Sequence, residues 1–221
     1  MRWCALVACL VCAVSAGAYN FESNGIYYNI TSRDPATVEV TYYNDYHKYT
    51  GSVNIPSSVT HDGTTYTVTA IGQEAFYKCH DLTNVTLPST LTDIRNYAFY
   101  DCLKLEKVTL PNSLTYLGAY AFAYCGSEAS SFTSVVVPDA VIDLGFGAFT
   151  GCKKLTNVTL GSGVSIMNEN VFKECTALTN VTCLAMTPPI IYRSAFVQSH
   201  YSSVNLKVPK SSVSAYQANS N

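Results

Sequence analysis

The sequence predicts an α/β solenoid, a right-handed coil with a parallel β-sheet on one side and short helical segments on the other. Three observations support this prediction: a repeat of about 23 residues, a recurring aliphatic and aromatic pattern within it, and strand-like segments at the same spacing. Repeats of about 20–29 residues with aliphatic anchors are typical of solenoids, because one such unit cannot bury its apolar face until a neighbour stacks on it.

Cysteine and phenylalanine mark the repeat most clearly. Five cysteines follow one another at intervals of 23, 23, 27 and 23 residues, and a phenylalanine stands three residues before each. The long interval contains four extra residues around 126–130, and an insertion confined to one repeat is expected to form a surface loop. The predicted structural core of the repeats comprises Phe76, Phe99, Phe122, Phe149 and Phe172, together with Cys79, Cys102, Cys125, Cys152 and Cys175.

Within one repeat the periodicity changes from helical to strand-like. Ile71, Phe76 and Cys79 are spaced so that one face of a short helical turn would be apolar. The pattern then alternates, so Val85 and Leu87 are expected to point inward and the polar residues between them outward, as in a half-buried strand. A proline follows, and it ends the strand because it cannot donate to a ladder. Each repeat should therefore supply one helical segment and one strand.

The stretch from Ile71 to Pro88 reads Ile-Gly-x-x-Ala-Phe-x-x-Cys-x-x-Leu-x-x-Val-x-Leu-Pro. It resembles the BspA-like leucine-rich repeats of bacterial and protist surface proteins. Five copies match in register over nearly the whole mature chain. The resemblance implies a leucine-rich-repeat-like solenoid, and it implies contact with host matrix proteins or with other cells.

The N-terminus is predicted to be a targeting segment. Residues 1–18 begin with one positive charge at Arg2, continue with an apolar run and end in Ala16-Gly17-Ala18, which fits signal-peptide cleavage near Ala18. A lipoprotein-like cleavage box ending at Cys9 is the alternative, but only eight residues precede that cysteine. No second apolar stretch follows, so we expect a secreted or cell-surface protein without a transmembrane span.

Three segments are predicted after the signal peptide. Residues 19–70 should form a β-rich N-terminal cap and the first repeat strand, and residues 71–186 the leucine-rich repeats. Residues 187–221 are similar to the C-terminal capping repeat of the family. That exit usually continues further, so a short or truncated member is expected.

Composition and spacing argue against catalysis and against nucleic-acid binding. The formal net charge is −2, and a chain without a basic footprint is not expected to bind nucleic acid. The cysteines lack the close pairs that zinc sites need, and His80 is one variable loop residue. We therefore expect no enzyme activity, no metal and no cofactor. The stacked cysteines should be small buried hydrophobes, although coils about 4.8 Å apart would also allow disulfides between them.

Two surfaces are candidates for binding a protein or glycoprotein, either host matrix or another cell surface. Tyrosines at equivalent repeat positions should form an aromatic strip on the helical flank, and the outward strand face offers small polar side chains. The sequence predicts an adhesin-like scaffold. The alternative is a structural or accessory repeat domain without its own ligand, in which the tyrosines merely cover the solenoid. The candidate residues are Tyr77, Tyr97, Tyr100, Tyr120 and Tyr124 on the strip and Asn84, Lys107 and Asn157 on the strand face.

Overall fold

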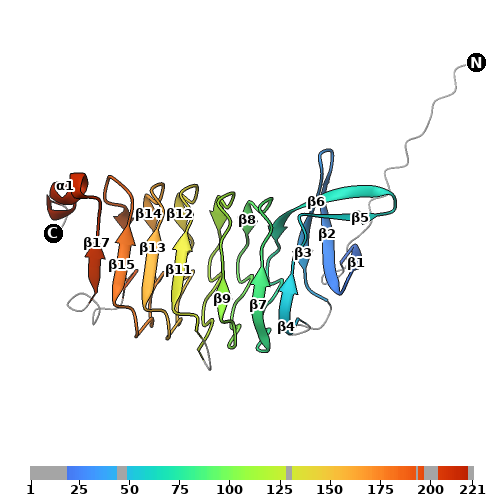
Figure 1. Ribbon diagram of the computed structural model, residues 1–221, viewed down its shortest axis with the longest axis horizontal. Coiled ribbons are helices and arrows are strands. Elements are labelled where there is room, and N and C mark those ends of the chain that lie inside the picture. The colour runs from blue at the N-terminus through green and yellow to red at the C-terminus, as the bar shows by residue number, and fades with distance from the viewer. Residues whose placement is uncertain (1–18, 44–48, 128–130, 193, 197–203, 219–221) are drawn as a thin grey trace, which may run out of the picture.

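A computed structural model describes residues 19–43, 49–127, 131–192, 194–196 and 204–218, and shows an elongated β-solenoid (Figure 1). Each coil consists of a front strand, a back strand and a loop that carries the repeat phenylalanine. We number the coils by that residue. Coils 1 to 6 contain, in order, Phe76, Phe99, Phe122, Phe149, Phe172 and Phe196.

The front strands form two parallel sheets instead of the single sheet predicted. In each sheet the register follows the repeat, so that Val85 aligns with Val108 and Val135 with Val158. Among the described residues no pairing joins β9 to β11, the two strands that flank the four-residue insertion. The first sheet contains β4 (Gly51–Asn54), β7 (Leu82–Thr86) and β9 (Lys107–Val108), and the second contains β11 (Ser134–Val137), β13 (Asn157–Leu160), β15 (Asn180–Cys183) and β17 (Asn205–Lys207).

The back of the solenoid is a ten-stranded sheet that the sequence did not predict. Five coils contribute only two residues each: β8 (Asp93–Ile94), β10 (Tyr116–Leu117), β12 (Asp143–Leu144), β14 (Ile166–Met167) and β16 (Ile190–Ile191). The sheet starts with β1 (Phe21–Ser23), β2 (Ile26–Arg33), β3 (Ala36–Thr41) and β6 (Thr64–Ile71), and β5 (Ser58–His61) pairs with β6. The pairings among β1, β2 and β3 are antiparallel, and from β3 to β6 onward the coils stack in parallel.

The helical segments predicted opposite the front sheet do not occur in the described coils, and that prediction was wrong. In coil 1, residues 73–78 form consecutive turns because Glu74 and Lys78 have φ of 59° and 54°, in the left-handed region that ends a helix. The amides of Glu74, Phe76 and Lys78 donate to carbonyls of coil 2 instead of to residues four positions back. The single described α-helix, α1 (Val213–Ala218), follows a 3-10 turn, η2 (Lys210–Ser212), at the C-terminal end.

The same two backbone positions are left-handed in the later coils. They lie two residues before and two residues after the repeat phenylalanine. The residues before it are Tyr97, Tyr120, Gly147, Asn170 and Ser194, and those after it are Asp101, Tyr124, Gly151 and Glu174.

The repeat phenylalanines form a continuous column through the core. The rings of coils 1 to 5 are fully buried and stack within 7° of parallel, with centroids 4.8 Å apart between coils 1 and 2 and 5.7 Å apart between coils 4 and 5. Stacked apolar rings exclude water between coils, so this column provides much of the hydrophobic stabilisation of the fold.

The cysteines form a second column, and the six that are described are buried and form no disulfide. Four of them have a role beyond filling space, because each thiol donates to the phenylalanine carbonyl of the preceding coil. Cys125 Sγ lies 3.0 Å from the oxygen of Phe99, and Cys152 Sγ lies 3.1 Å from that of Phe122. Cys102 and Cys175 repeat this contact in their coils. Burial raises the pKa of the Cys102, Cys125 and Cys152 thiols, which therefore remain protonated donors.

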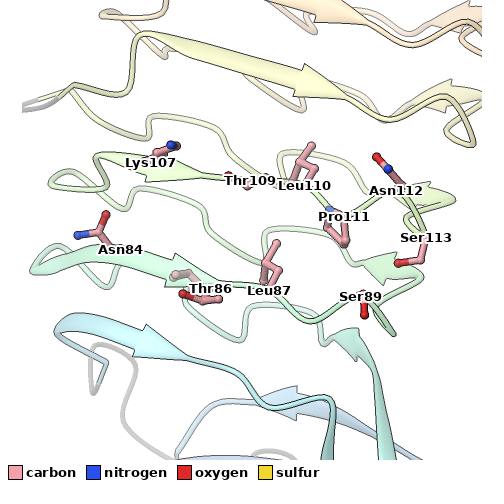
Figure 2. A pocket seen from close by; sticks show the side chains of 11 residues that line it. Asn84, Thr86, Leu87, Ser89, Lys107, Thr109, Leu110, Pro111, Asn112 and Ser113 are labelled. Carbon is pink, nitrogen blue, oxygen red and sulfur yellow. The ribbon is translucent and has the colours of Figure 1, made fainter.

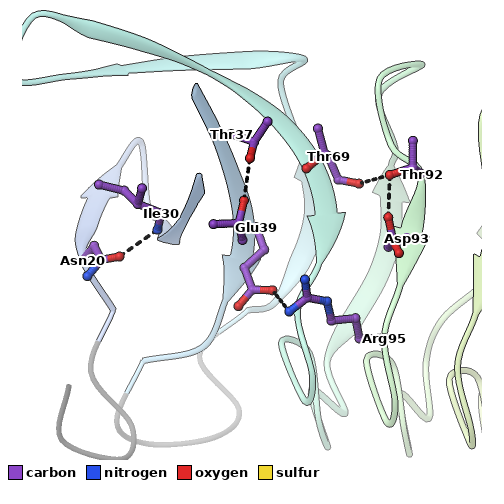
Figure 3. Close-up of polar contacts among 9 residues, drawn as sticks. Asn20, Ile30, Thr37, Glu39, Thr69, Thr92, Asp93 and Arg95 are labelled. Carbon is purple, nitrogen blue, oxygen red and sulfur yellow. Dashed lines mark hydrogen bonds and ion pairs between the residues drawn. The ribbon is translucent and has the colours of Figure 1, made fainter. Parts of the chain in front are cut away.

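A polar network ties the N-terminal strands to coil 2 (Figure 3). Glu39 on β3 forms an ion pair with Arg95, with Oε2 and Nη1 2.5 Å apart. Burial raises the pKa of Glu39, although the positive charge of Arg95 opposes this shift. Immediately before β8, the Thr92 hydroxyl donates to the carbonyl of Thr69 on β6 at 3.2 Å, so side chains and strand pairing together join these elements.

Candidate functional site

Six aromatic rings from coils 1 to 4 form a contiguous cluster on the loop side of the solenoid. Tyr77 stacks on Tyr100 and Tyr97 stacks on Tyr120, with centroids 5.2 Å apart in both pairs and ring planes within 16° of parallel. All six side chains are half-buried, so their stems are packed while part of each ring remains open to solvent. We call this cluster the tyrosine strip; it consists of Tyr77, Tyr97, Tyr100, Tyr120, Tyr124 and Phe146.

Tilted contacts join the two stacked columns into one surface. The Tyr97 and Tyr100 centroids are 5.7 Å apart, and Tyr124 meets Tyr100 edge-on at 5.5 Å. Phe146 extends the strip into coil 4 by packing 5.3 Å from Tyr120. Sequence reasoning missed Phe146 because it stands three residues before Phe149, outside the positions that the tyrosines share.

The ring faces of the strip are largely covered. Tyrosines stack on one another, and Lys78 Nζ lies 5.3 Å from the centre of the Tyr77 ring. At the other end, the Tyr120 ring lies against Gly147, and a Cβ added to Gly151 would stand 2.3 Å from Cδ1 of Tyr124. The strip therefore presents ring edges and phenol hydroxyls, which suit edge contacts and hydrogen bonds better than stacking of a flat ligand on a ring face.

The hydroxyls of Tyr100, Tyr120 and Tyr124 stay protonated at neutral pH. The pKa values of Tyr100, Tyr120 and Tyr124 are raised, first by partial burial and then by neighbouring groups that carry or develop negative charge, such as Asp101. A protonated phenol both donates and accepts a hydrogen bond. The strip is thus an amphipathic surface that carries no charge of its own.

The front face offers a second, shallower surface between β7 and β9 (Figure 2). A groove of about 700 Å³ runs across the two coils, with Leu87, Leu110 and Pro111 between its polar ends. Asn84 and Lys107 align in the register of the two strands and line one end of the groove. Asn157 lies on β13 in the other front sheet, where its Oδ1 accepts a hydrogen bond from Asn180, so the structure does not bring all three predicted residues together.

Charged side chains of the loops form two contacts between coil 1 and coil 2. His80 Nε2 lies 3.1 Å from Asp101 Oδ2, and Lys104 Nζ lies 2.6 Å from Asp81 Oδ1. The hydrogen bond and charge of Lys104 lower the pKa of Asp81. Within the described ranges, no three His, Cys, Asp or Glu side chains are grouped as a metal site would need.

Comparison with known families resolves the identity of the repeats. The profile of the BspA type leucine rich repeat region matches residues 46–130 and 127–220, with six copies. The chain belongs to the BspA-type leucine-rich repeat family. Its repeats correspond to the coils described above, whose phenylalanine is buried in coils 1 to 5 and partly buried in coil 6. Among curated proteins, no sequence matches the chain significantly.

Solved structures of other leucine-rich repeat proteins resemble this BspA-type chain. A leucine-rich repeat protein of T. pallidum is 27% identical, with a TM-score of 0.60 over 73% of this chain and 70% of that one. A leucine-rich repeat protein from Bacteroides ovatus is 23% identical, with a TM-score of 0.48 over 86% of this chain and 67% of that one. The first of these supports the solenoid fold independently of the family profile.

Two further expectations concern the membrane. The predicted signal peptide, residues 1–18 with Arg2 and Ala18, lies outside the described residues. Within the part of the BspA-type chain that the structure describes, no helix has the length and apolar character needed to cross a bilayer.

Proposed function

We propose that this chain is a secreted or cell-surface binding module, a scaffold without catalytic activity that holds a protein or glycoprotein ligand on the tyrosine strip. The observation that carries the proposal is the contiguous cluster of six half-buried rings on adjacent coils. Tyrosine is enriched at protein interfaces because it combines a large apolar ring with a polar tip. Host matrix or another cell surface is the proposed source of the ligand.

The strip is a better candidate than the front groove for two reasons. It gathers large, stiff side chains that lose little conformational freedom on binding, whereas the groove between β7 and β9 is lined mainly by small residues. The strip is also continuous over four coils, while the front face is divided between two sheets. The groove with Asn84 and Lys107 is the second proposed surface.

Two residues of the strip have a structural role in addition to the proposed binding role. Tyr120 and Tyr124 lie against Gly147 and Gly151, so they also hold coil 4 in place. Tyr77, Tyr97 and Tyr100 pack on other rings of the strip, and ligand binding is proposed chiefly for these three. The glycine contacts of Tyr120 and Tyr124 favour the second candidate function, a structural or accessory domain whose tyrosines only cover the coils.

The segments of the proposed protein follow the sequence prediction. Residues 1–18 direct export and are removed near Ala18, residues 19–70 cap the N-terminal end, residues 71–186 carry the repeats, and residues 187–221 end the solenoid. Export through a signal peptide accounts for a binding surface that must meet matrix or another cell.

The test is binding of the purified protein to immobilised matrix proteins and mucins. Tyr97→Ala combined with Tyr100→Ala removes two central rings, and we expect it to weaken binding by about 2 kcal/mol or more, roughly thirtyfold. A Tyr97→Phe and Tyr100→Phe variant keeps the stacking and removes only the hydroxyls, so it separates hydrogen bonding from ring contact. Because the strip carries little charge, added salt should change the affinity only weakly.

The matched control alters the front face at Asn84, Lys107 and Asn157 by substitution with alanine. Loss of binding only in that control would place the ligand on the front face. Unchanged binding in every variant, or no binding by the original protein, would contradict the proposal and favour the structural role. Thermal melts of each variant show whether the fold is intact.

A further inference from the structure

The front strands of coils 2 and 3 pair over a shorter distance than those of the second front sheet. In the described chain, β7 and β9 align at two positions, Asn84 with Lys107 and Val85 with Val108, whereas β11 and β13 align at four. The groove of about 700 Å³ in Figure 2 extends from these two pairs past the point where the pairing stops. The groove therefore coincides with the place where two neighbouring front strands are no longer joined.

The middle of the groove is apolar, because one member of a core column stays partly open there. Leu87 and Leu110 stand at the repeat position that Leu160 and Cys183 occupy in the second front sheet. Leu110, Leu160 and Cys183 are buried, but Leu87 is only partly buried. Pro111 is also partly buried and lines the groove beside them. These side chains offer C–H surface that an apolar face of a ligand can cover.

Polar side chains around this apolar patch are free to bind a ligand. Thr86, Thr109 and Asn112 line the groove and are exposed, and their side chains form no hydrogen bond within the described residues. In the second front sheet, by contrast, Asn180 Nδ2 donates to Asn157 Oδ1 at 3.0 Å. Hydroxyl and amide groups both donate and accept hydrogen bonds. Such groups around an apolar patch complement a sugar ring, which has hydroxyls along its edge and C–H groups on its faces.

The groove carries one charge, and it is positive. Among the eleven residues that line it, Lys107 is the single charged one, and its ammonium forms no ion pair within the described residues. The aligned front-strand positions carry only serine or asparagine: Ser52, Asn84, Ser134, Asn157, Asn180 and Asn205. A polymer with a carboxylate on every unit would therefore meet one cation on this face. A ligand with a single carboxylate, such as an acidic sugar that ends a glycan, matches the groove better.

We propose that the groove between β7 and β9 binds an acidic sugar at the end of a glycan, with the sugar carboxylate paired to Lys107. Leu87 and Pro111 contact the C–H face of the sugar ring, and the free hydroxyls and amide of the lining bind its hydroxyls. The inference rests on the second surface of the proposed function and names the ligand of that surface. It leaves the tyrosine strip available for the protein part of the same glycoprotein.

The experiment is calorimetric titration of the purified protein with sialyllactose, whose terminal sugar carries a carboxylate, and with lactose, which lacks that sugar. We expect sialyllactose to bind at least tenfold more tightly than lactose, and added salt to weaken its binding. Lys107→Gln should lower the affinity for sialyllactose at least tenfold, about 1.4 kcal/mol, and abolish the preference. The matched control is Lys154→Gln, which removes an exposed positive charge in coil 4 outside the groove and should bind as the original protein does.

A second variant tests the hydrogen bonds separately from the charge. Thr109→Val keeps the size of an exposed side chain and removes its hydroxyl, so the fold should be intact. We expect a lower affinity for sialyllactose with the same dependence on salt, because Lys107 is still present. Unchanged affinity in this variant would contradict the proposed contact of the sugar with the apolar middle of the groove.

Several outcomes would overturn the proposal. They are equal affinity of the original protein for the two sugars, full sialyllactose binding by Lys107→Gln, equal losses in Lys107→Gln and Lys154→Gln, and tighter binding of a hyaluronan oligosaccharide or of a peptide with a free carboxyl terminus. The Tyr97→Ala and Tyr100→Ala variant separates this inference from the proposed function, because it should bind sialyllactose normally. Loss of sialyllactose binding in that variant would overturn the inference, whereas unchanged binding to immobilised matrix would contradict the proposed role of the tyrosine strip.

Discussion

The interface between coils 4 and 5 and the interface between coils 3 and 4 are built from the same repeat but held together differently. Between coils 4 and 5, β11 and β13 pair at four positions, from Ser134 with Asn157 to Val137 with Leu160. Between coils 3 and 4, no strand pairing joins β9 to β11 in the part of the chain that the structure describes. The front strands are therefore unpaired with each other at the insertion, between β9 and β11, and paired at the next interface, between β11 and β13.

On the loop side the two interfaces are alike. The amides of Tyr120, Phe122 and Tyr124 donate to carbonyls of coil 4 at distances of 2.7–2.8 Å, and the corresponding amides of coil 4 donate to carbonyls of coil 5 at 2.7–3.0 Å. Adjacent coils are therefore joined by three separate sets of contacts: strand pairing on the front, backbone hydrogen bonds between the loops, and the phenylalanine column. The fold tolerates loss of the front strand pairing at the insertion because the loop hydrogen bonds and the phenylalanine column remain. Tyr120 and Tyr124 add contacts with coil 4 on the loop side.

The largest loss of stability is expected from removing a ring of the phenylalanine column between coils 3 and 4, where the front strands do not pair. Phe122→Ala should lower the free energy of unfolding by about 3–5 kcal/mol, through lost burial and the cavity that remains. Because the ladder cannot compensate there, the two halves of the solenoid should unfold in separate steps in a urea titration. Thr109→Ala, on the exposed side of coil 3, should change the free energy by less than about 0.5 kcal/mol. Similar losses in both variants would contradict the assignment of inward and outward faces.

The next largest effect tests whether coil 4 needs glycine where a tyrosine ring packs against its backbone. Gly151→Ala should destabilise the protein by about 2–3 kcal/mol, because φ is +72° and the new Cβ would stand 2.3 Å from the Tyr124 ring. In the background of Tyr124→Ala, the same change should cost only the backbone strain, about 1 kcal/mol. This double-mutant cycle, measured by thermal or urea unfolding, gives no coupling if the ring does not pack on Gly151.

A smaller change, which increases the stability of the protein, tests whether the insertion causes the missing pairing between β9 and β11. Deletion of residues 127–130 restores the 23-residue spacing between coils 3 and 4. If the insertion alone separates β9 from β11, their pairing should form and stabilise the protein by about 1–2 kcal/mol, with slower hydrogen exchange at Val108 and Val135. Deletion of residues 153–156, from a coil of regular length, is the control and should destabilise. Faster exchange after the first deletion would show that another feature holds the strands apart.

The smallest effect concerns the thiol contacts. Cys152→Ala removes the donor to the Phe122 carbonyl at the open interface, and Cys175→Ala removes the equivalent donor at the closed one. Each should cost about 1 kcal/mol, and Cys152→Ser should recover part of the loss because it keeps a donor. Unfolding curves of the three variants provide the measurement. An equal loss for serine and alanine would mean that the thiols act only as apolar fillers.

The sequence predicted those features that repeat in register. Phe76 to Phe172 recur at equivalent repeat positions, so alignment alone placed them in the core of the repeats. The same alignment predicted that Tyr97 would meet Tyr120 and that Tyr77 would meet Tyr100, as the structure shows. Neither prediction required knowledge of the backbone between the aligned positions, because stacking depends only on equivalence. The ligand-binding role of these tyrosines remains a prediction.

The features that the sequence did not predict depend on backbone conformation. Ile71 and Phe76 have helical spacing, but two left-handed residues per loop give the same inward positions without a helix. The back strands β8 to β16 contain two residues each, too few for an alternating pattern to be recognised. The missing pairing between β9 and β11 follows from how adjacent coils fit, which no single repeat encodes.

The paired left-handed positions also limit how the loop surface can vary between related chains. A side chain with a Cβ is strained at these two positions, least so for asparagine and aspartate, and glycine alone avoids the strain. The backbone conformation restricts substitution at these positions, for example at Glu174, whether or not the side chain contacts a ligand. The neighbouring positions of Gln73 and Tyr77 have no such restriction. New binding specificities should therefore arise first in those two unrestricted columns, where side chains can be exchanged without altering the path of the chain.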